Sequence, residues 1–200
     1  MSGLWMRSAI FGLTLQLLLG VAGAWAGPPT DLVKQVIEKS LDALKEPGSS
    51  EARRQKVKRI VDPYFDYQEM AKRSLGPAWG KLSPGQRQEF VALFAQLLEA
   101  SYSDKIEKYA QRVKIDYTGE IASGDNVEVR TVVVRSNDRI PLNYRLMNEG
   151  GTWKVYDVVI EGVSLVSNYR SQFSRIIHES SYAELVKRLK TKVSELTRAG

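Results

Sequence analysis

Apolar side chains recur at helical spacing between about residues 30 and 111, so we predict that the first part of the fold is helical. Thr30 stands where the N-cap of the first helix is expected. A long helix is predicted to begin at the SPGQ segment, because Ser83 and Gln86 have the order of a capping box. The apolar stripe of the first helix consists of Leu32, Val33, Val36, Ile37, Leu41 and Leu44.

The period changes from helical to alternating over residues 113–160. The turn-forming segments SGDN, SND and NEGG divide this region into four runs, which predicts a meander of four antiparallel strands. Helical spacing returns over about 163–197 and predicts two C-terminal helices. We therefore expect a single α+β domain over residues 27–200. In it a curled four-stranded antiparallel sheet packs with helices from both ends of the chain, in a cone-like shape with an apolar cavity.

Residues 1–26 have the features of a signal peptide. Arg7 supplies a positive charge, an apolar run extends from Ala9 to Val21, and Ala-Trp-Ala at 24–26 is typical of a cleavage site. An N-terminal membrane anchor is the alternative. We expect cleavage near Ala26 and a soluble periplasmic protein. The chain has no cysteine, so packing without disulfides must stabilise it in that oxidising compartment.

The charge pattern suggests a surface role but no nucleic-acid partner. The 200-residue chain has a net charge of +6, and five basic residues fall among seven positions from Arg53 to Arg59. A solvated helix face is the usual meaning of such a run; a docking surface for anionic lipid headgroups or an acidic partner is the alternative. Nucleic acid is not expected, because no aromatic residues interleave with basic ones on a strand.

Residues for catalysis or metal binding are scarce, and we expect no metal and no cofactor. His178 is the single histidine, and without cysteine it cannot build a usual zinc site; we interpret it as a surface or helix-capping residue. Strand alternation places Asp157 on the face of Trp153, Val155 and Val159. It could serve there as a general base in a small cone-fold enzyme, but a position at an open rim or a shift of register is the preferred interpretation.

Three segments together resemble one family. They are YFDYQEMAKRSLGPAWGKLSPGQRQEF (64–90), VYDVVIEGVSLVSNYRSQF (155–173) and AELVKRLKTK (183–192), and they are similar to the toluene-tolerance family of the Mla lipid-transport system. The resemblance implies a non-enzymatic protein that encloses phospholipid acyl chains. Some relatives are associated with hopanoids or other lipids, so a related membrane lipid is the alternative cargo. The resemblance also implies a shuttle between an outer-membrane lipoprotein complex and an inner-membrane ABC transporter with its MCE-domain partner.

The predicted lipid-binding residues come from both the strands and the helices. Apolar residues at these spacings suit a packed core equally well, so a ligand-free adaptor stays open from the residues alone. Tyr144 and Tyr169 could place hydroxyl groups near the polar end of a lipid, and Arg170 is expected to be structural, with phosphate binding as the second possibility. The predicted lining comprises Leu97, Leu98, Val129, Leu142, Tyr144, Trp153, Val155, Val159, Val163, Tyr169 and Phe173.

Overall fold

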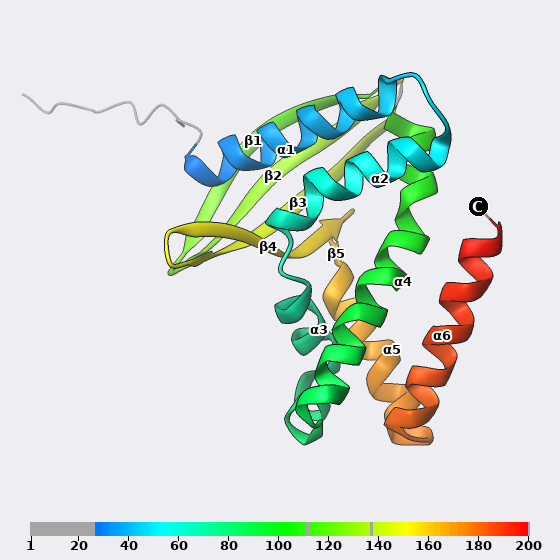
Figure 1. The fold of residues 1–200 in the computed structure, drawn as a ribbon. Coiled ribbons are helices and arrows are strands. Elements are labelled where there is room, and N and C mark those ends of the chain that lie inside the picture. Colours follow the sequence, from blue (N-terminus) through cyan, green and yellow to red (C-terminus); the bar gives the residue numbers. More distant parts are fainter. Residues whose placement is uncertain (1–26, 111–112, 137, 200) are drawn as a thin grey trace, which may run out of the picture.

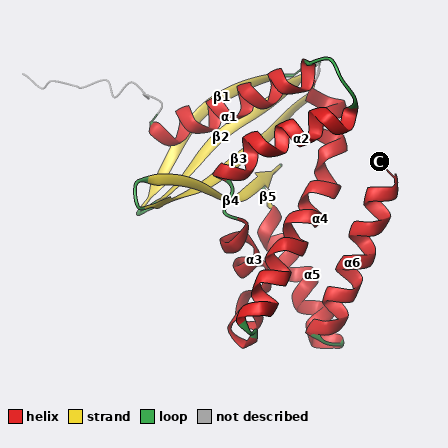
Figure 2. Ribbon diagram, viewed as in Figure 1, coloured by secondary structure: helices red, strands yellow, loops and turns green. Residues whose placement is uncertain are grey.

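The computed structural model describes residues 27–110, 113–136 and 138–199 (Figure 1). The predicted signal peptide, residues 1–26, lies outside the described residues. Helices precede and follow one antiparallel sheet, so the predicted α+β class is confirmed (Figure 2).

The elements follow one another in the expected order. The first helical region contains α1 (Pro28–Lys45), α2 (Ser50–Val61), the 3-10 turn η1 (Asp62–Tyr64), α3 (Tyr67–Leu75), the 3-10 segment η2 (Gly76–Lys81) and α4 (Pro84–Ala110). The sheet contains β1 (Lys114–Ser123), β2 (Asn126–Arg135), β3 (Asp138–Glu149), β4 (Thr152–Ile160) and β5 (Val163–Ser164). The chain continues with α5 (Leu165–Glu179) and α6 (Tyr182–Ala199).

The long helix α4 begins as its sequence predicts. The Ser83 amide donates to Gln86 Oε1 at 2.9 Å, and the Gln86 amide donates to Ser83 Oγ at 3.3 Å. This reciprocal pair is a capping box, which satisfies two amides at the start of the helix.

The start of α1 differs from the prediction that Thr30 caps it. The helix begins at Pro28, with Gly27 as N-cap, because proline suits the first turn, where no amide partner is needed. Thr30 lies inside that turn and is buried. Its hydroxyl donates to Glu120 Oε2 of β1 at 2.7 Å, so the side chain links α1 to the sheet instead of capping the helix.

The sheet has the order β1-β2-β3-β4-β5 with antiparallel pairing throughout. The fifth strand is short and lies where the sequence predicted the start of a helix. We call the face that carries Val127, Val129, Leu146 and Val155 the inner face; α1 packs across it. The opposite face is called the outer face.

A β-bulge in β4 reverses the expected positions of two residues. Leu146 pairs with Val155, but its neighbour Arg145 pairs with Asp157, so β4 has one extra residue at Tyr156. Because side chains alternate along a strand, this insertion moves Asp157 and Val159 to the outer face. Strand alternation alone had placed both on the face of Val155, so that prediction was wrong, and the register shift is the correct interpretation.

The molecule has two hydrophobic cores. One lies between α1 and the inner face, and the other lies within the bundle of α3, α4, α5 and α6. Two short segments attach the bundle to the edge of β4: Phe65 forms a parallel bridge with Val155, and β5 pairs with Val159 and Ile160. Phe65 packs against both cores, so it sits at their junction.

Candidate functional site

The inner face and α1 enclose a small apolar cavity. Its volume is about 20 Å³. That is room for about one water molecule and far below the roughly 300–1,000 Å³ of sites for small molecules. The cavity is therefore closed to an acyl chain in this conformation. Its lining comprises Leu32, Val33, Val36, Ile37, Tyr64, Phe65, Tyr144 and Val155.

Two phenols at the inner face carry no charge near neutral pH, whereas the carboxylate of Glu120, which pairs with Val129, lies at the edge strand β1 and accepts from Thr30. Burial raises the pKa of the Tyr117 phenol to about 12, and burial also raises the pKa of the Tyr144 phenol. The buried Thr131 hydroxyl donates to the Leu142 carbonyl oxygen, which satisfies it within the sheet. Among the described residues that line the cavity, a hydrocarbon chain would meet no charged side chain.

The structure divides the predicted lining residues between the two cores. Val129, Tyr144, Trp153 and Val155 lie together in the core beneath α1. Leu142 shares the face of Tyr144 by strand alternation and is half-buried. Four further members belong to the bundle core and are Leu97, Leu98, Tyr169 and Phe173.

Aromatic rings fill the bundle core. The Phe94 ring meets the Tyr169 ring edge-on at a centroid distance of 5.3 Å, and Phe173 lies 5.8 Å from Phe90 in the same manner. Interlocked rings of this kind pack as a protein interior. The structure therefore places these four predicted residues in a packed bundle and not beside the cavity under α1.

Two predicted residues lie in neither place. Val159 is buried, but the bulge directs it to the outer face, where β5 pairs with it. Val163 begins β5 and is 59% exposed, because the chain forms an edge strand there before α5 starts.

Sequence reasoning missed the contribution of α1 to the cavity. Leu32, Val36 and Ile37 were recognised as one apolar stripe, but the stripe alone does not say which element it covers. Tyr64 and Phe65 were also missed, because they lie in the irregular segment between α2 and α3, which has no periodicity.

Asp157 fastens three elements on the outer face. Its carboxylate accepts hydrogen bonds from Arg145 Nη1 at 3.2 Å, Ser164 Oγ at 2.6 Å and the Val166 amide at 3.1 Å. The Val166 amide lies in the first turn of α5, so the negative charge also faces the positive end of that helix. Only 3% of the residue is exposed. These contacts make Asp157 a structural residue and leave it poorly placed to be a general base.

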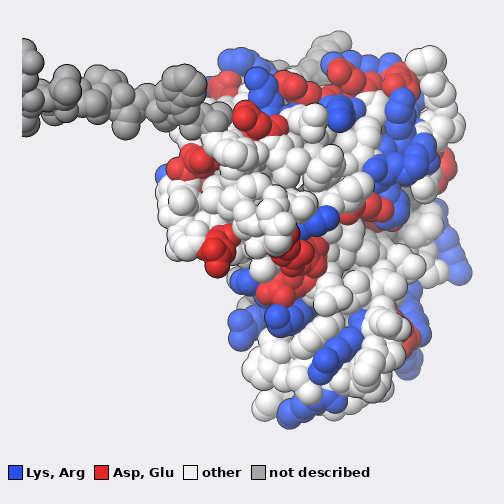
Figure 3. Space-filling view, turned by 60° about the vertical axis from the view of Figure 1, so that its left-hand side comes forward, with Lys and Arg blue, Asp and Glu red and all other residues white. Residues whose placement is uncertain are grey.

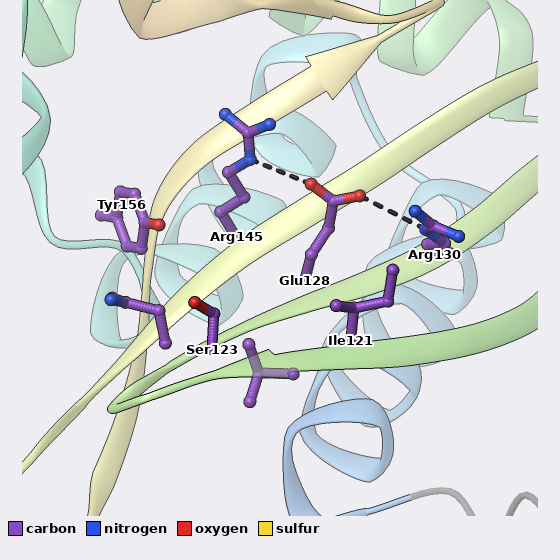
Figure 4. A pocket seen from close by; sticks show the side chains of 8 residues that line it. Ile121, Ser123, Glu128, Arg130, Arg145 and Tyr156 are labelled. Atoms are coloured by element: carbon purple, nitrogen blue, oxygen red, sulfur yellow. Dashed lines mark hydrogen bonds and ion pairs between the residues drawn. The ribbon is translucent and has the colours of Figure 1, made fainter.

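A shallow groove of about 220 Å³ lies on the outer face (Figure 4). Its centre is Glu128, which lies between Arg145 at 3.0 Å and Arg130 at 3.4 Å. Burial opposes the charge on Glu128, but the two arginines outweigh it and lower the pKa of the carboxyl group. The arginines are thus already paired with a carboxylate.

A family profile described as "MlaC protein" matches residues 34–191. The chain belongs to the MlaC family. The match spans both cores, from α1 to α6, so the family assignment covers the cavity and the bundle alike.

Named relatives agree with the MlaC assignment. The chain is 24% identical over 144 residues to "Intermembrane phospholipid transport system binding protein MlaC" of Haemophilus influenzae, covering 70% of this chain and 67% of that protein. It is 28% identical over 121 residues to "Toluene tolerance protein ttg2D" of Pseudomonas putida, covering 59% of this chain and 56% of that one.

A solved structure has the same fold as this MlaC-family chain. It is a phospholipid-binding protein from Ralstonia solanacearum in complex with a phospholipid, with a TM-score of 0.77 and 25% sequence identity. The similarity covers 84% of this chain and 97% of the other. Within the described residues of this chain, no helix is long and apolar enough to cross a membrane.

The basic run of α2 is largely neutralised in this member of the MlaC family. Arg53 and Arg54 both bind Glu107 of α4, and Lys56 binds Glu46. Lys58 binds Asp62 at 2.8 Å. Four of the five cations thus have a carboxylate partner, and Arg53 and Arg54 hold α2 against α4, which weakens the interpretation of this run as a docking surface.

Proposed function

We propose that this protein is a periplasmic lipid carrier, soluble after cleavage near Ala26, that holds phospholipid acyl chains against the inner face beneath α1. The observation that carries the proposal is a cavity lined by apolar and tyrosine side chains between the sheet and a single amphipathic helix. A related fold is known with a phospholipid bound, which supports the same assignment. The proposed lining combines α1 and Phe65 with Val129, Leu142, Tyr144 and Val155.

The energetics of transport require such a covered face. Each buried CH₂ group contributes roughly 0.8 kcal/mol, so a chain of about sixteen carbons resists exposure to water by on the order of 12 kcal/mol. A hydrogen bond contributes about 1 kcal/mol net and cannot replace this cover. The inner face supplies apolar contacts over several strands, which is the kind of surface that a hydrocarbon chain needs.

Loading requires the cavity to open, since about 20 Å³ admits no chain. We assign the movement to α1. Its contact with β1 includes the hydrogen bond between Thr30 and Glu120 at 2.7 Å, which can break and re-form. The bundle, by contrast, is held by interlocked aromatic rings and stays intact. Separation of α1 from the sheet exposes the inner face without disturbing the bundle.

The carrier needs no catalytic group of its own. Asp157, the residue considered for a general base, is occupied by three hydrogen bonds to the fold. The partners that fit this role are an outer-membrane lipoprotein complex and an inner-membrane ABC transporter with an MCE-domain component. These partners would set the direction of transport, because a passive carrier binds and releases lipid without a preferred direction.

A charged side chain on the inner face tests the proposal. Leu142→Arg places a cation where acyl chains would lie, whereas Ile121→Arg places the same group on the outer face, at a position that is 45% exposed. We expect near-stoichiometric lipid in solvent extracts of the wild type and of Ile121→Arg, and little in Leu142→Arg. Circular dichroism checks that both variants fold. Undiminished lipid in a folded Leu142→Arg variant would contradict the lining.

A further inference from the structure

The positive charge of the protein is concentrated in the bundle. Residues 67–110 and 165–199, which include α3, α4, α5 and α6, contain thirteen Lys and Arg and eight Asp and Glu, a net charge of +5. The rest of the chain after residue 26 contains fifteen Lys and Arg and fifteen Asp and Glu, a net charge of zero. In Figure 3 blue side chains predominate over the lower part of the molecule, whereas red and blue are mixed over the upper part.

Ion pairs inside the bundle leave its cations in excess. Seven of its eight carboxylates are already paired. Glu69 binds Lys72 and Arg73, Glu89 binds Lys190, Glu184 binds Arg188 and Glu195 binds Lys192, whereas Glu99, Asp104 and Glu107 bind cations of α2. Among the residues that the structure describes, Lys81, Arg87, Arg170 and Arg175 form no ion pair with a carboxylate. Lys81, Arg170 and Arg175 are exposed, and Arg87 is half-buried.

Three of these cations surround η2, the segment that leads to the end of the bundle remote from the sheet (Figure 1). Lys81 ends η2, and the Arg87 guanidinium lies 5.4 Å from the Trp79 ring centroid while its Nε donates to the Trp79 carbonyl. Arg170 of α5 lies so close to Gly76 that an added Cβ would be 2.9 Å from its Nε. We call Trp79, Lys81, Arg87 and Arg170 the basic corner.

We propose that the basic corner docks the protein on a bilayer surface that contains anionic phospholipids. Lysine and arginine near such a surface are attracted by its negative potential, and arginine forms charge-assisted hydrogen bonds with phosphate oxygens. Tryptophan is enriched at the level of lipid headgroups, where its ring meets apolar material and its N–H meets water. Trp79 is half-buried and packs against the bundle core.

The position of the basic corner separates this contact from the lipid cavity. The cavity lies under α1, whereas η2 lies in the bundle. Docking by the bundle leaves α1 uncovered and able to move. The inference goes beyond the carrier function and does not depend on it.

Vesicle co-sedimentation with the chain that starts at Gly27 tests the docking. The variant Lys81→Glu/Arg87→Glu is compared with Lys34→Glu/Lys39→Glu, which makes the same change of charge on exposed residues of α1. The probe is phosphatidylcholine vesicles with about 30 mol% phosphatidylglycerol, against pure phosphatidylcholine. We expect a loss of roughly fivefold in partitioning for each cation removed, hence about 25-fold or more for the first variant and a much smaller loss for the second.

A second readout reports on the corner itself. Trp153→Phe leaves Trp79 as the single tryptophan after residue 26, and its fluorescence should shift to the blue when anionic vesicles are added. Salt at about 0.5 M should reverse both signals by screening. An equal loss of vesicle partitioning in both charge variants would overturn the proposal. A wild-type protein that does not bind anionic vesicles would also overturn it, whether or not an acidic protein binds the basic corner instead.

The outcome for docking is independent of the outcome for lipid carriage. If solvent extracts contain lipid but the protein does not bind anionic vesicles, the docking proposal alone is contradicted. If the protein binds these vesicles through the basic corner but its extracts contain no lipid, the carrier proposal alone is contradicted.

Discussion

A single carboxylate joins the sheet to the bundle. Asp157 of β4 accepts from Arg145 of β3, from Ser164 of β5 and from the Val166 amide of α5. Because the residue is buried, an unpaired charge there would be costly, and each of these donors offsets that cost. The residue thus sets where α5 leaves the sheet.

Replacement of this carboxylate should destabilise the protein strongly. Asp157→Ala removes three hydrogen bonds, and we expect a loss of about 2–4 kcal/mol in the free energy of unfolding. Asp42→Ala is the matched control, because its salt bridge with Lys45 is exposed and should contribute less than about 0.5 kcal/mol. Urea titration measures both. A change in Asp157→Ala no larger than that in the control would show that the network does not stabilise the fold.

Strand alternation predicted most inward-facing residues but failed after Tyr156. Val129, Tyr144 and Val155 face inward as expected. The failure at Asp157 and Val159 comes from a bulge, which depends on pairing between strands. A local sequence pattern contains no information on that pairing, so the register shift was one alternative among several.

The first two helices form a hairpin that α4 holds in place. α2 lies against α4 through Glu107, which accepts from Arg53 Nε at 3.2 Å and from Arg54 Nε at 3.0 Å. α1 follows this arrangement, because a short loop joins it to α2. The cation run that drew attention in the sequence therefore positions the proposed cover of the lipid site.

Acid should loosen this hairpin. Burial opposes ionisation of Glu107, but hydrogen bonds from Arg53 and Arg54 outweigh it and lower the pKa of the carboxyl group. Because the pKa of Glu107 is lower in the folded protein than in the unfolded chain, its ionised form stabilises the fold. This stabilisation is fully present above the pKa of the unfolded chain, about 4.3, and is lost as the pH falls through the pKa of the folded protein.

Glu107→Gln tests this pH dependence. We expect a loss of about 1–2 kcal/mol at pH 7 and a weaker fall in stability than the wild type shows below about pH 4. Glu46→Gln, whose partner Lys56 is exposed, is the control and should change little. Denaturant titrations at several pH values decide the matter, and parallel curves for Glu107→Gln and the wild type would refute the role of this carboxyl group.

Elements were predicted well where their signals are local. The capping box at Ser83 fixed the start of α4, since both of its partners are three residues apart. The prediction that Thr30 caps α1 was wrong, because a hydroxyl group can donate to a carboxylate far away in the sequence as readily as it accepts from a nearby amide. The stripe on α1 was recognised, but its partner on the sheet required the tertiary structure.

On the scale of the whole molecule, two cores meet along the edge of β4. One is aromatic and interlocked, and the other has a cavity beneath a single helix. Such a division allows one part to open while the other remains folded. Neither composition nor net charge could predict it, because both are sums over the chain, whereas the family resemblance indicated the arrangement of helices and sheet.

Removal of bound lipid should affect the two cores unequally. We expect the delipidated protein to melt roughly 5–10 °C lower than protein with lipid at about 100 times the Kd. Amide exchange should accelerate in α1 and in the inner-face strands, with little change in α4 and α6. Hydrogen-exchange mass spectrometry measures this difference. Uniform acceleration throughout the chain would argue against an independent opening of α1.

The bulge in β4 also links the face on which Asp157 lies to the pairing of the strands. Tyr156 is the additional residue of the bulge. Because of it, Asp157 lies on the outer face, where it accepts from Arg145, Ser164 and the first turn of α5. If β4 paired without the bulge, Tyr156 would stand opposite Arg145, Asp157 would point into the apolar interior, and α5 would lose its anchor. Deletion of Tyr156 would instead remove the bulge and leave Asp157 opposite Arg145, so the side on which this carboxylate lies depends on the register of β4 against β3 and not on the identity of residue 156.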